Sequence, residues 1–501
     1  MPMYLLGVDI GTSSAKSVIF DCDGNLITQA SRAYVFEAAK SGYAEQDPDV
    51  WWTAVTESMK EAMETSFIDK KDLAGIGLSG QMHGMVCVDQ NGKPVRKAIL
   101  HCDVRAGEEA DEIRMIAGDE FSQIVYNPIF PGMQAVSLYW VKQHEPECYN
   151  RIKTVVCPKD YIRYKMTGKL GTEHTDASGT LFYDQENFVW SERIFEILGI
   201  DMSLVPEDIH SSCDVAGGMT KEAAELCGVA PGTPVIYGGG DQAMHSLGNN
   251  VFRPGTTMAT IGTSGQVLSI VERPVYNPNL NTHMFRHVED NTWFGLGAVL
   301  SAGSALDWFR RNMDHESSFE ELSRLAEGVA CGSDGLVFLP CMTGERTPYL
   351  DPAARGVFFG LSMKHSKAHF ARAIMEGVSF AMKSALNEVD NLFGKQEVLI
   401  CAGGGVKSKA WAQIQADIYG RDIMASTVKE QACLGAAIAA GVGTKLFASV
   451  EEGCHRMCTN GTVIYHPNPE CVNWYAGIYE GIYSKLYINN KELFSIASQY
   501  Y

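Results

Sequence analysis

Three kinds of segment are missing from this sequence of 501 residues. It has no run of 18 apolar residues, which a membrane-spanning helix needs. Its first residues, MPMYLLGVDIG, have neither the basic start nor the apolar stretch of a signal peptide. The pattern G-x-x-x-x-G-K-[ST] of the Walker-type nucleotide-binding loop is also absent. The sequence therefore predicts a protein without membrane spans that does not bind nucleotides through a Walker-type fold.

Positive charge is also scarce. The chain carries 41 Lys and Arg against 60 Asp and Glu, a formal net charge of −19. A nucleic-acid partner calls for a basic patch, so this balance argues against one, and we interpret the acidity as a source of solubility. Hydrophobic residues make up 46% and charged residues 20%, as in globular proteins. A chain of this length predicts two or three domains.

Cysteines at metal-binding spacing are few. The 14 cysteines are scattered, and a chain of this size needs no disulfides for stability. Cys454 and Cys458 lie on either side of His455, but no second pair of ligands follows at suitable spacing. We therefore expect no metal site there, and reduced thiols fit a cytoplasmic protein best.

The sequence does contain two copies of a short pattern. Residues 6–20 read LGVDIGTSSAKSVIF, and residues 258–271 read MATIGTSGQVLSIV. Each copy predicts a β-hairpin with a Gly-Thr-Ser turn, whose closely spaced N–H groups and hydroxyls suit phosphate oxygens. Only the first copy has a carboxylate on its strand, Asp9, where the second has Thr260. We expect both turns to hold phosphate, and Asp9 to coordinate magnesium through water.

A second pair of segments supports a duplication. PVIYGGGDQA at 234–243 and VLICAGGGVK at 398–407 are apolar strands that run into three glycines. One such segment alone would be interpreted as a tight turn, but two matched pairs in the same order favour a nucleotide or phosphate site. They also predict a duplicated domain. We place the boundary between halves 1–250 and 251–501, which should enclose a cleft.

Strands and helices mix in both halves, which predicts an α/β architecture. The region 106–200 is expected to be mainly helical and to carry substrate specificity. The last predicted helix is rich in small residues, which allow close packing against a strand or a nucleotide. The predicted helices are 51–65, 221–227, 304–312, 367–392, 410–419 and 434–440. The predicted strands outside the hairpins are 74–79, 85–88, 235–237 and 398–401.

Two further positions are candidates for catalysis or ligand binding. Asp241 follows a triple glycine, so its side chain could cap the next helix or act as general base on a hydroxyl nucleophile, and the residues alone leave both open. Met82 and His83 lie between two glycines, which free the backbone to present these side chains to a ligand. A lone histidine is more often structural than catalytic.

Taken together, these motifs resemble the FGGY family of carbohydrate kinases over nearly the whole chain. GQMHG, together with AEQDP and DASGT, is specific to the xylulokinase-like members, whereas glycerol kinases carry Arg-Glu at the Met-His position. The resemblance implies an α/β fold of two ribonuclease H-like domains, of the actin and sugar-kinase superfamily, with a catalytic cleft between them. The motifs that carry it are GVDIGTSSAK from Gly7, GYAEQDP from Gly42, GLSGQMHG from Gly77, TDASGTLFYD from Thr175, GGGDQA from Gly238, GTSG from Gly262 and CAGGGVKSKAWAQIQAD from Cys401.

The resemblance also implies roles for individual residues, with ATP and Mg²⁺ as cofactors. Asp241 matches the catalytic base and contacts the sugar together with Met82 and His83. Asp9 matches the acidic residue that acts in catalysis and helps to hold magnesium and the phosphates. Several relatives have Asn at the position of Ser408. The nucleotide-binding residues implied are Gly11, Thr12, Lys16, Gly262, Thr263, Gly303, Gly404 and Ser408.

Four residues depart from the xylulokinase pattern. His101 and Cys102 stand in LHCD where LWND is usual, and Gln134 and Ser137 follow PGM where the usual segment reads Pro-Gly-Phe-Thr with a later Lys. We expect these loops to lie near the sugar side of the cleft. They therefore bear on the choice of sugar and not on the phosphoryl transfer itself.

The sequence thus predicts an ATP-dependent kinase that transfers the γ-phosphate to a primary hydroxyl of a small ketose, D-xylulose, giving D-xylulose 5-phosphate. Another ketopentose, a polyol or gluconate stays open as the substrate, and an actin-like ATPase without sugar kinase activity is a more distant alternative. The expected partners are the sugar and ATP, with neither nucleic acid nor membrane. The oligomeric state, including a homodimer, stays open.

Overall fold

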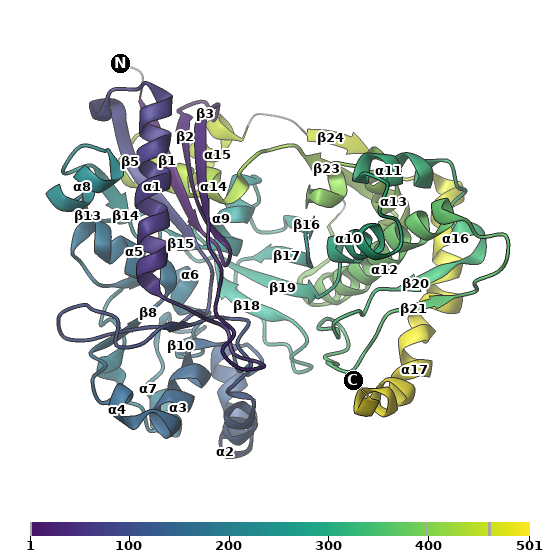
Figure 1. Cartoon of the computed structure of the whole chain (residues 1–501), viewed down its shortest axis with the longest axis horizontal. Helices are drawn as coiled ribbons and strands as arrows, with labels where there is room; N and C mark the ends of the chain where they lie inside the picture. Colours follow the sequence, from purple (N-terminus) through teal and green to yellow (C-terminus); the bar gives the residue numbers. More distant parts are fainter. Residues whose placement is uncertain (1–2, 397, 459–461, 501) are drawn as a thin grey trace.

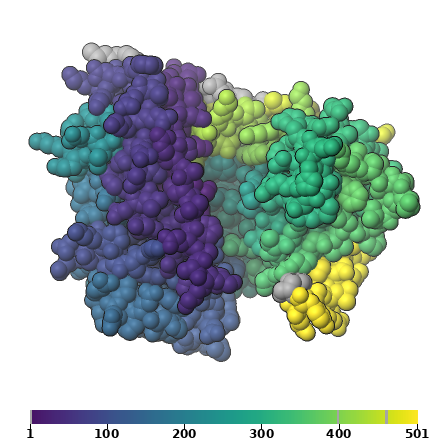
Figure 2. Space-filling model, in the orientation of Figure 1, coloured from purple at the N-terminus to yellow at the C-terminus, as the bar shows by residue number. Residues whose placement is uncertain are grey.

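The computed structural model describes residues 3–396, 398–458 and 462–500, so Met1, Pro2 and Tyr501 of the predicted halves lie outside it. Two bodies, each built around a β-sheet, lie side by side, with the N-terminal strands in one and the strands after residue 256 in the other (Figure 1). The surface is hollowed between them (Figure 2). Within the described ranges, no helix combines the length and apolarity that crossing a membrane requires.

The first sheet has the order β13-β14-β5-β1-β2-β3, with β15 beside β5. β1 is antiparallel to β2 and parallel to β5, and β15 is also parallel to β5. The carboxyl ends of β1, β5 and β15 therefore meet at one edge of the sheet, where open α/β sheets bind ligands. The strands are β1 (Tyr4–Ile10), β2 (Ser14–Asp21), β3 (Leu26–Ala33), β5 (Leu73–Gly80), β13 (Val215–Gly218), β14 (Pro234–Ile236) and β15 (Gly239–Gly240).

The second sheet repeats this arrangement in the order β18-β19-β17-β16-β22-β23-β24. β16 is antiparallel to β17 and parallel to β22, as β1 is to β2 and β5. The duplication predicted from the two hairpins is therefore confirmed. The strands are β16 (Thr257–Ile261), β17 (Gly265–Val271), β18 (His283–Arg286), β19 (Trp293–Val299), β22 (Val398–Gly403), β23 (Asp422–Ser426) and β24 (Thr462–Tyr465).

Helices cover both sheets, and short strands pair outside them. The helices of residues 1–250 are α1 (Pro48–Ser66), α2 (Gly107–Val125), α3 (Gln134–His144), α4 (Pro146–Tyr149), α5 (Pro158–Thr167), α6 (His174–Ala177), α7 (Glu192–Leu198), α8 (Lys221–Cys227) and α9 (Asp241–Gly248). Those that follow are α10 (Gly303–Asn312), α11 (Phe319–Glu327), α12 (Lys367–Phe393), α13 (Lys409–Tyr419), α14 (Gln431–Gly443), α15 (Val450–Met457), α16 (Pro469–Ile478) and α17 (Ser484–Ala497). The short strands are β4 (Glu45–Gln46), β6 (Val86–Val88), β7 (Ala98–Ile99), β8 (Thr154–Val156), β9 (Thr172–Glu173), β10 (Tyr183–Asp184), β11 (Val189–Trp190), β12 (Ile209–His210), β20 (Val337–Leu339) and β21 (Val357–Phe359).

The predicted elements agree closely with these bounds. The helix predicted at 221–227 has the bounds of α8, and the other predicted helices are extended at one or both ends by one to three residues. The region 106–200 is mainly helical, as predicted, and it also contains short strands, of which β8 pairs antiparallel with β6 and β10 with β11. These strands are two or three residues long, too short for a period-2 pattern to reveal them.

The two faces of β1 pack on helices from opposite ends of the chain. Leu6 and Val8 belong to one core cluster with α1, whereas Leu5 belongs to another with α14. Since side chains alternate along a strand, Asp9 points to the α14 face. In Figure 1, α14 and α15 (yellow-green) lie next to the purple strands of the first sheet.

Glycines allow α14 to approach this sheet closely. A Cβ added at Gly7 would lie 1.9 Å from the carbonyl oxygen of Cys433, and one at Gly77 would lie 1.8 Å from that of Ala436. A side chain at either position would push the helix off the sheet. The prediction that the small residues of 434–440 pack against a strand is confirmed.

Candidate active site

Asp9 lies near the end of β1, directly before the first Gly-Thr-Ser turn. Its Oδ1 accepts a hydrogen bond of 2.7 Å from the Ser79 hydroxyl, which stands opposite it on β5. Burial raises the pKa of the Asp9 carboxyl, while the Ser79 hydrogen bond and the charge of Lys16 oppose that rise. Carboxylate oxygens are ligands that Mg²⁺ prefers, usually one or two together with water. The position is therefore chemically suited to a hydrated magnesium ion.

Asp241 is the first residue of α9, at the same edge of the sheet. Burial raises the pKa of its carboxyl to about 7, and the negative charge of Asp9 adds to the rise. The two carboxyl groups are thus close enough to interact. The N-cap position of α9 is occupied by Gly240, without a side-chain cap. A carboxyl that titrates near neutral pH can accept and release a proton, as a general base must.

Met82 and His83 follow the end of β5. Met82 packs against Gly240, the residue before Asp241, where a Cβ would lie 2.7 Å from its Cγ. The Nδ1 atom of His83 is 2.7 Å from the carbonyl oxygen of Gly179, which can only accept, so Nδ1 carries the hydrogen. Burial lowers the pKa of His83 to about 4, which leaves the ring neutral and its Nε2 a hydrogen-bond acceptor. The structure therefore places Met82 next to the start of α9, with His83 directly after it in the chain.

The first Gly-Thr-Ser turn is held from outside the hairpin. The Tyr34 hydroxyl donates to the carbonyl of Gly11 at 2.7 Å, and the Gln46 amide donates to that of Thr12 at 2.8 Å. Within the turn, the Gly11 N–H donates to the Ser14 carbonyl at 3.0 Å. Because its carbonyl groups are occupied, the turn has a fixed shape.

Lys16 has a partner that sequence reasoning missed. Its ammonium group lies 2.5 Å from Oε2 of Glu430, the residue directly before α14. The two residues are 414 positions apart, so no local signal could have paired them. This ion pair ties the start of α14 to β2, the strand that follows the first Gly-Thr-Ser turn.

A cavity of about 820 Å³ lies within the second body. The turn of the second hairpin is tied there to the start of α10, because the Gly303 N–H donates to the Gly262 carbonyl at 2.8 Å. Helix N-termini present free N–H groups that favour phosphate. The lining includes five of the predicted nucleotide residues, namely Gly262, Thr263, Gly303, Gly404 and Ser408.

Ser408 is the N-cap residue of α13. The other three predicted nucleotide residues, Gly11, Thr12 and Lys16, lie at the first hairpin, outside the lining of this cavity. The Ser408 hydroxyl accepts from the Trp411 N–H at 3.1 Å and lies 2.5 Å from the Ser323 hydroxyl of α11. The predicted nucleotide residues therefore form two groups, one at the first turn and one around the cavity, each on its own body.

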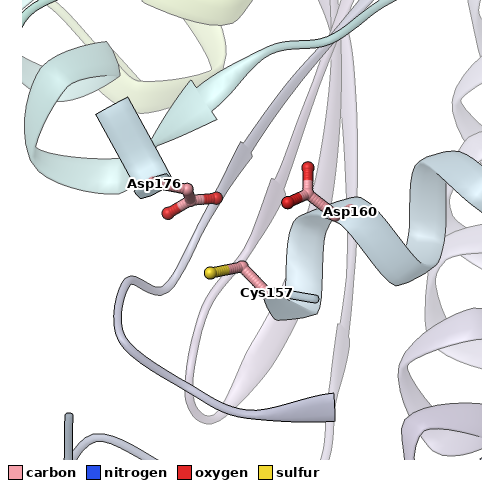
Figure 3. Close-up of side chains that lie close together, drawn as sticks. All are labelled: Cys157, Asp160 and Asp176. Carbon is pink, nitrogen blue, oxygen red and sulfur yellow. The ribbon is translucent and has the colours of Figure 1, made fainter. Parts of the chain in front are cut away.

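The side chains of Cys157, Asp160 and Asp176 lie close together, as the ligands of a metal ion would (Figure 3). The ammonium group of Lys159 already stands there, 2.8 Å from Asp160 and 3.2 Å from Asp176. Burial raises the pKa of the Cys157 thiol well above its usual value, so it stays protonated, and Mg²⁺ does not bind thiols. This group is therefore a poor magnesium site, with a lysine as its cation.

The Lys159 cluster, defined as Lys159, Asp160, Arg163, Glu173 and Asp176, is fully buried. Burial raises the pKa of the Asp176 carboxyl well above its ordinary value, and the charge of Lys159 opposes that rise. The ammonium group of Lys159 also lies 3.3 Å from Glu173, so one buried cation is shared by three carboxyl groups.

Hydrogen bonds through Thr175 connect the Lys159 cluster to Gly240, the residue before Asp241. Glu173 accepts hydrogen bonds from the Thr175 N–H at 2.7 Å and from its hydroxyl at 2.8 Å, and the Thr175 hydroxyl accepts from the Gly240 N–H at 2.8 Å. Sequence reasoning missed this support for Asp241, although Thr175 begins one of the family-like motifs.

The four departures from the xylulokinase pattern take different positions. His101 is half-buried, with its Nδ1 atom shielded from solvent, and desolvation together with the charge of Arg346 lowers its pKa to about 4. Gln134 and Ser137 are buried on α3 and donate to backbone carbonyls at 3.4 and 3.2 Å, respectively. Cys102 is exposed. His101 is thus the member of this set placed to contact a ligand beside His83.

Comparisons with known proteins agree with this geometry. Residues 4–248 match the N-terminal domain, and residues 257–444 the C-terminal domain, of the FGGY family of carbohydrate kinases. The chain is 35% identical over 489 residues to a protein named xylulose kinase from Staphylococcus epidermidis, covering 98% of this chain and 97% of that one.

Solved structures are similar as well. A xylulose kinase from Lactobacillus acidophilus superposes with a TM-score of 0.91 at 25% identity, and a gluconate kinase from the same organism with 0.90 at 26%, each over 98% of both chains. Matches to both family domains, which together cover most of the chain, identify the protein at the level of its family. The chain belongs to the FGGY family of carbohydrate kinases.

Proposed function

We propose that this carbohydrate kinase transfers the γ-phosphate of ATP to O5 of D-xylulose. The observation that carries the proposal is the meeting of Asp9 and Asp241, with a pKa near 7 for Asp241, beside Met82 and His83. It is also supported by the similarity to a protein named xylulose kinase at 35% identity. The free thiols of all 14 cysteines are consistent with work in the cytoplasm.

In this proposal Asp241 accepts the proton of the attacking hydroxyl, and His83 orients the sugar through its acceptor Nε2. The two Gly-Thr-Ser turns hold the phosphates, and the cavity beside Ser408 takes the adenosine. Asp9 would hold Mg²⁺ through water, and the ion would supply positive charge to the phosphates. Phosphoryl transfer requires mainly such positioning and charge stabilisation from the protein.

We further propose that the halves divide the work. Residues 1–250 supply the sugar site, the first turn and the base, and residues 251–501 bind the nucleotide. The second half is not independent of the first, since α14 completes the first body.

A panel of acceptors tests the substrate. With ATP and Mg²⁺, D-xylulose is expected to have the highest kcat/KM among ketopentoses, polyols and gluconate, measured by coupled ADP release. A higher value for gluconate would overturn the choice of sugar, and the solved gluconate kinase of similar fold makes that acid the main competitor. ATP turnover that no sugar stimulates would instead favour an actin-like ATPase.

The pH dependence of kcat/KM is expected to have an acid limb near pH 7. Below the pKa of Asp241, about 7, this residue already carries the proton that it must accept. Activity should therefore fall about tenfold per pH unit well below that point. Asp9→Asn removes the negative charge that helps to raise this pKa, so the limb should move to lower pH even though the rate also falls. A limb at the same pH in both proteins would contradict the interaction between the carboxyl groups.

Sugar and nucleotide are expected to bind with positive coupling. Each ligand meets mainly one body, so both are needed for full closure, and the coupling should amount to about 5- to 150-fold in affinity. Calorimetry in both orders with a non-hydrolysable ATP analogue should give the same factor, and small-angle scattering should detect compaction with both ligands. Independent affinities and an unchanged radius of gyration would argue against closure.

A further inference from the structure

The sugar site is lined from both bodies by a chain of aromatic and imidazole rings. The His83 ring lies 5.4 Å from the Phe285 ring on β18, and the His283 ring lies 5.6 Å from Phe285. His283 in turn is 5.7 Å from Phe130, and the Arg346 guanidinium lies 5.1 Å above the Phe130 ring. The second body therefore reaches the first at the side of His83.

The guanidinium group of Arg346 faces this series of rings, and no carboxylate pairs with it in the described part of the protein. Its neighbour Glu345 points to the backbone, where it accepts from the N–H groups of Leu300 at 3.0 Å and Arg346 at 2.9 Å. Across the described ranges, no ion pair or hydrogen bond engages the Arg346 guanidinium. Arg346 is half-buried, and its guanidinium N–H groups can donate to the oxygens of a ligand.

The loop that carries Arg346 is fixed. The Thr347 hydroxyl donates to the Asn281 carbonyl at 2.6 Å and accepts from the Ala298 N–H at 3.0 Å, and the Thr347 N–H donates to the Ala298 carbonyl at 2.9 Å. The guanidinium is therefore held in place before any ligand arrives, as a binding residue should be.

Two buried imidazole nitrogens beside Arg346 are also without partners. The Nδ1 atoms of His101 and His283 are buried and make no hydrogen bond within the described part of the chain. Burial and the charge of Arg346 lower the pKa of both rings, so each is neutral and can donate or accept. Buried polar atoms are normally hydrogen-bonded, so this group also lacks a polar ligand.

The position of Arg346 relative to Asp241 indicates which end of a sugar it meets. Met82 packs against Gly240, the residue before Asp241, and its neighbour His83 begins the series of rings that ends at Phe130 and Arg346. We therefore place the guanidinium at the end of the sugar that is remote from the base.

On the basis of the proposed function, we propose that Arg346, His101 and His283 bind the oxygens at the non-reacting end of the acceptor sugar. For a ketopentose that reacts at O5, these are the oxygens on carbons 1 and 2. The sugar would then bridge the two bodies directly, and His101 would be a specificity-determining residue.

Arg346→Gln tests this binding role, with exposed Arg273→Gln as a matched control. With D-xylulose and ATP, the Arg346 variant should lose about 10- to 100-fold in kcat/KM, mostly through KM, and the control should change less than twofold. Calorimetric affinity for a non-hydrolysable ATP analogue should stay within twofold in both, which excludes misfolding. If Arg346→Gln does not fold, His283→Asn is measured in the same way.

An analogue without the hydroxyl on carbon 1 separates contact from structural support. The parent enzyme should have a lower kcat/KM with this analogue than with D-xylulose. The Arg346 variant should have nearly the same kcat/KM with both sugars, because removing either Arg346 or the hydroxyl abolishes the same contact. Undiminished discrimination, or an unchanged KM in a folded variant, would overturn the inference while xylulose turnover by the parent upholds the proposed function. Absence of xylulose turnover by the parent would instead reject the proposed function.

Discussion

Asp241→Asn is expected to lower kcat with D-xylulose by about 10²- to 10⁴-fold. Asparagine keeps the shape of the side chain but cannot accept a proton at neutral pH, so the attacking hydroxyl loses its base. Nucleotide affinity should persist, because the cavity that includes Ser408 lies in the other body. The measurement is single-turnover transfer of phosphate to sugar, with calorimetry of an ATP analogue alongside.

Stability separates this effect from damage to the fold. Burial raises the pKa of Asp241 to about 7. Ionisation of this carboxyl therefore lowers the stability of the folded protein above about pH 4, where the unfolded chain already ionises it. Asparagine resembles the protonated form, and the free energy of unfolding at neutral pH should therefore not fall. Exposed Asp69→Asn is the matched control and should keep full activity. Phosphorylation by Asp241→Asn within threefold of the parent would reject the assignment of the base.

Lys159→Met is expected to destabilise the first body by about 3–5 kcal/mol. The substitution keeps an unbranched, apolar stem but leaves Asp160 and Glu173 buried without their shared cation. The midpoint of thermal unfolding should drop by roughly 6–20 °C. Lys165→Met on the same helix is the control, because Lys165 pairs with the exposed Asp49 and should contribute less than about 1 kcal/mol.

The loss should depend on pH in a defined direction. Lys159 helps to lower the pKa of the buried Asp160 carboxyl, which burial opposes. Without the lysine, the Asp160 carboxylate loses this support, so stability is lost where the unfolded chain ionises, above about pH 4. The difference in the free energy of unfolding between Lys159→Met and the parent should therefore become smaller as the pH falls below about 5. A difference under 1 kcal/mol at pH 7, or protection of the parent by added divalent cations, would contradict a lysine-centred cluster.

Local patterns predicted the parts of the fold that short segments determine. The two Gly-Thr-Ser hairpins and the two triple glycines were enough for the duplicated topology, because strand alternation and turn chemistry are encoded within about ten residues. The start of α16 at Asn468-Pro469 is capped in the same way as the start of α1 at Asp47-Pro48, by a side-chain cap followed by proline, so that helix could have been predicted from the sequence.

Partners that meet through folding could not be predicted in this way. Nothing in the sequence pairs Lys16 with Glu430, yet they form an ion pair across 414 positions. Lys159 likewise gives no local sign of being fully buried among carboxyl groups. Which charges lie inside depends on the tertiary fold, and no pattern of spacing contains it.

The placement of α14 also has a consequence for synthesis. A ribosome releases all strands of the first sheet long before it reaches Gln431, where α14 begins. Until then, the glycine-lined face at Gly7 and Gly77 has no helix to cover it and stays open to water and to other nascent chains. The first sheet is thus the earliest part of the protein to be made and among the last to be completed.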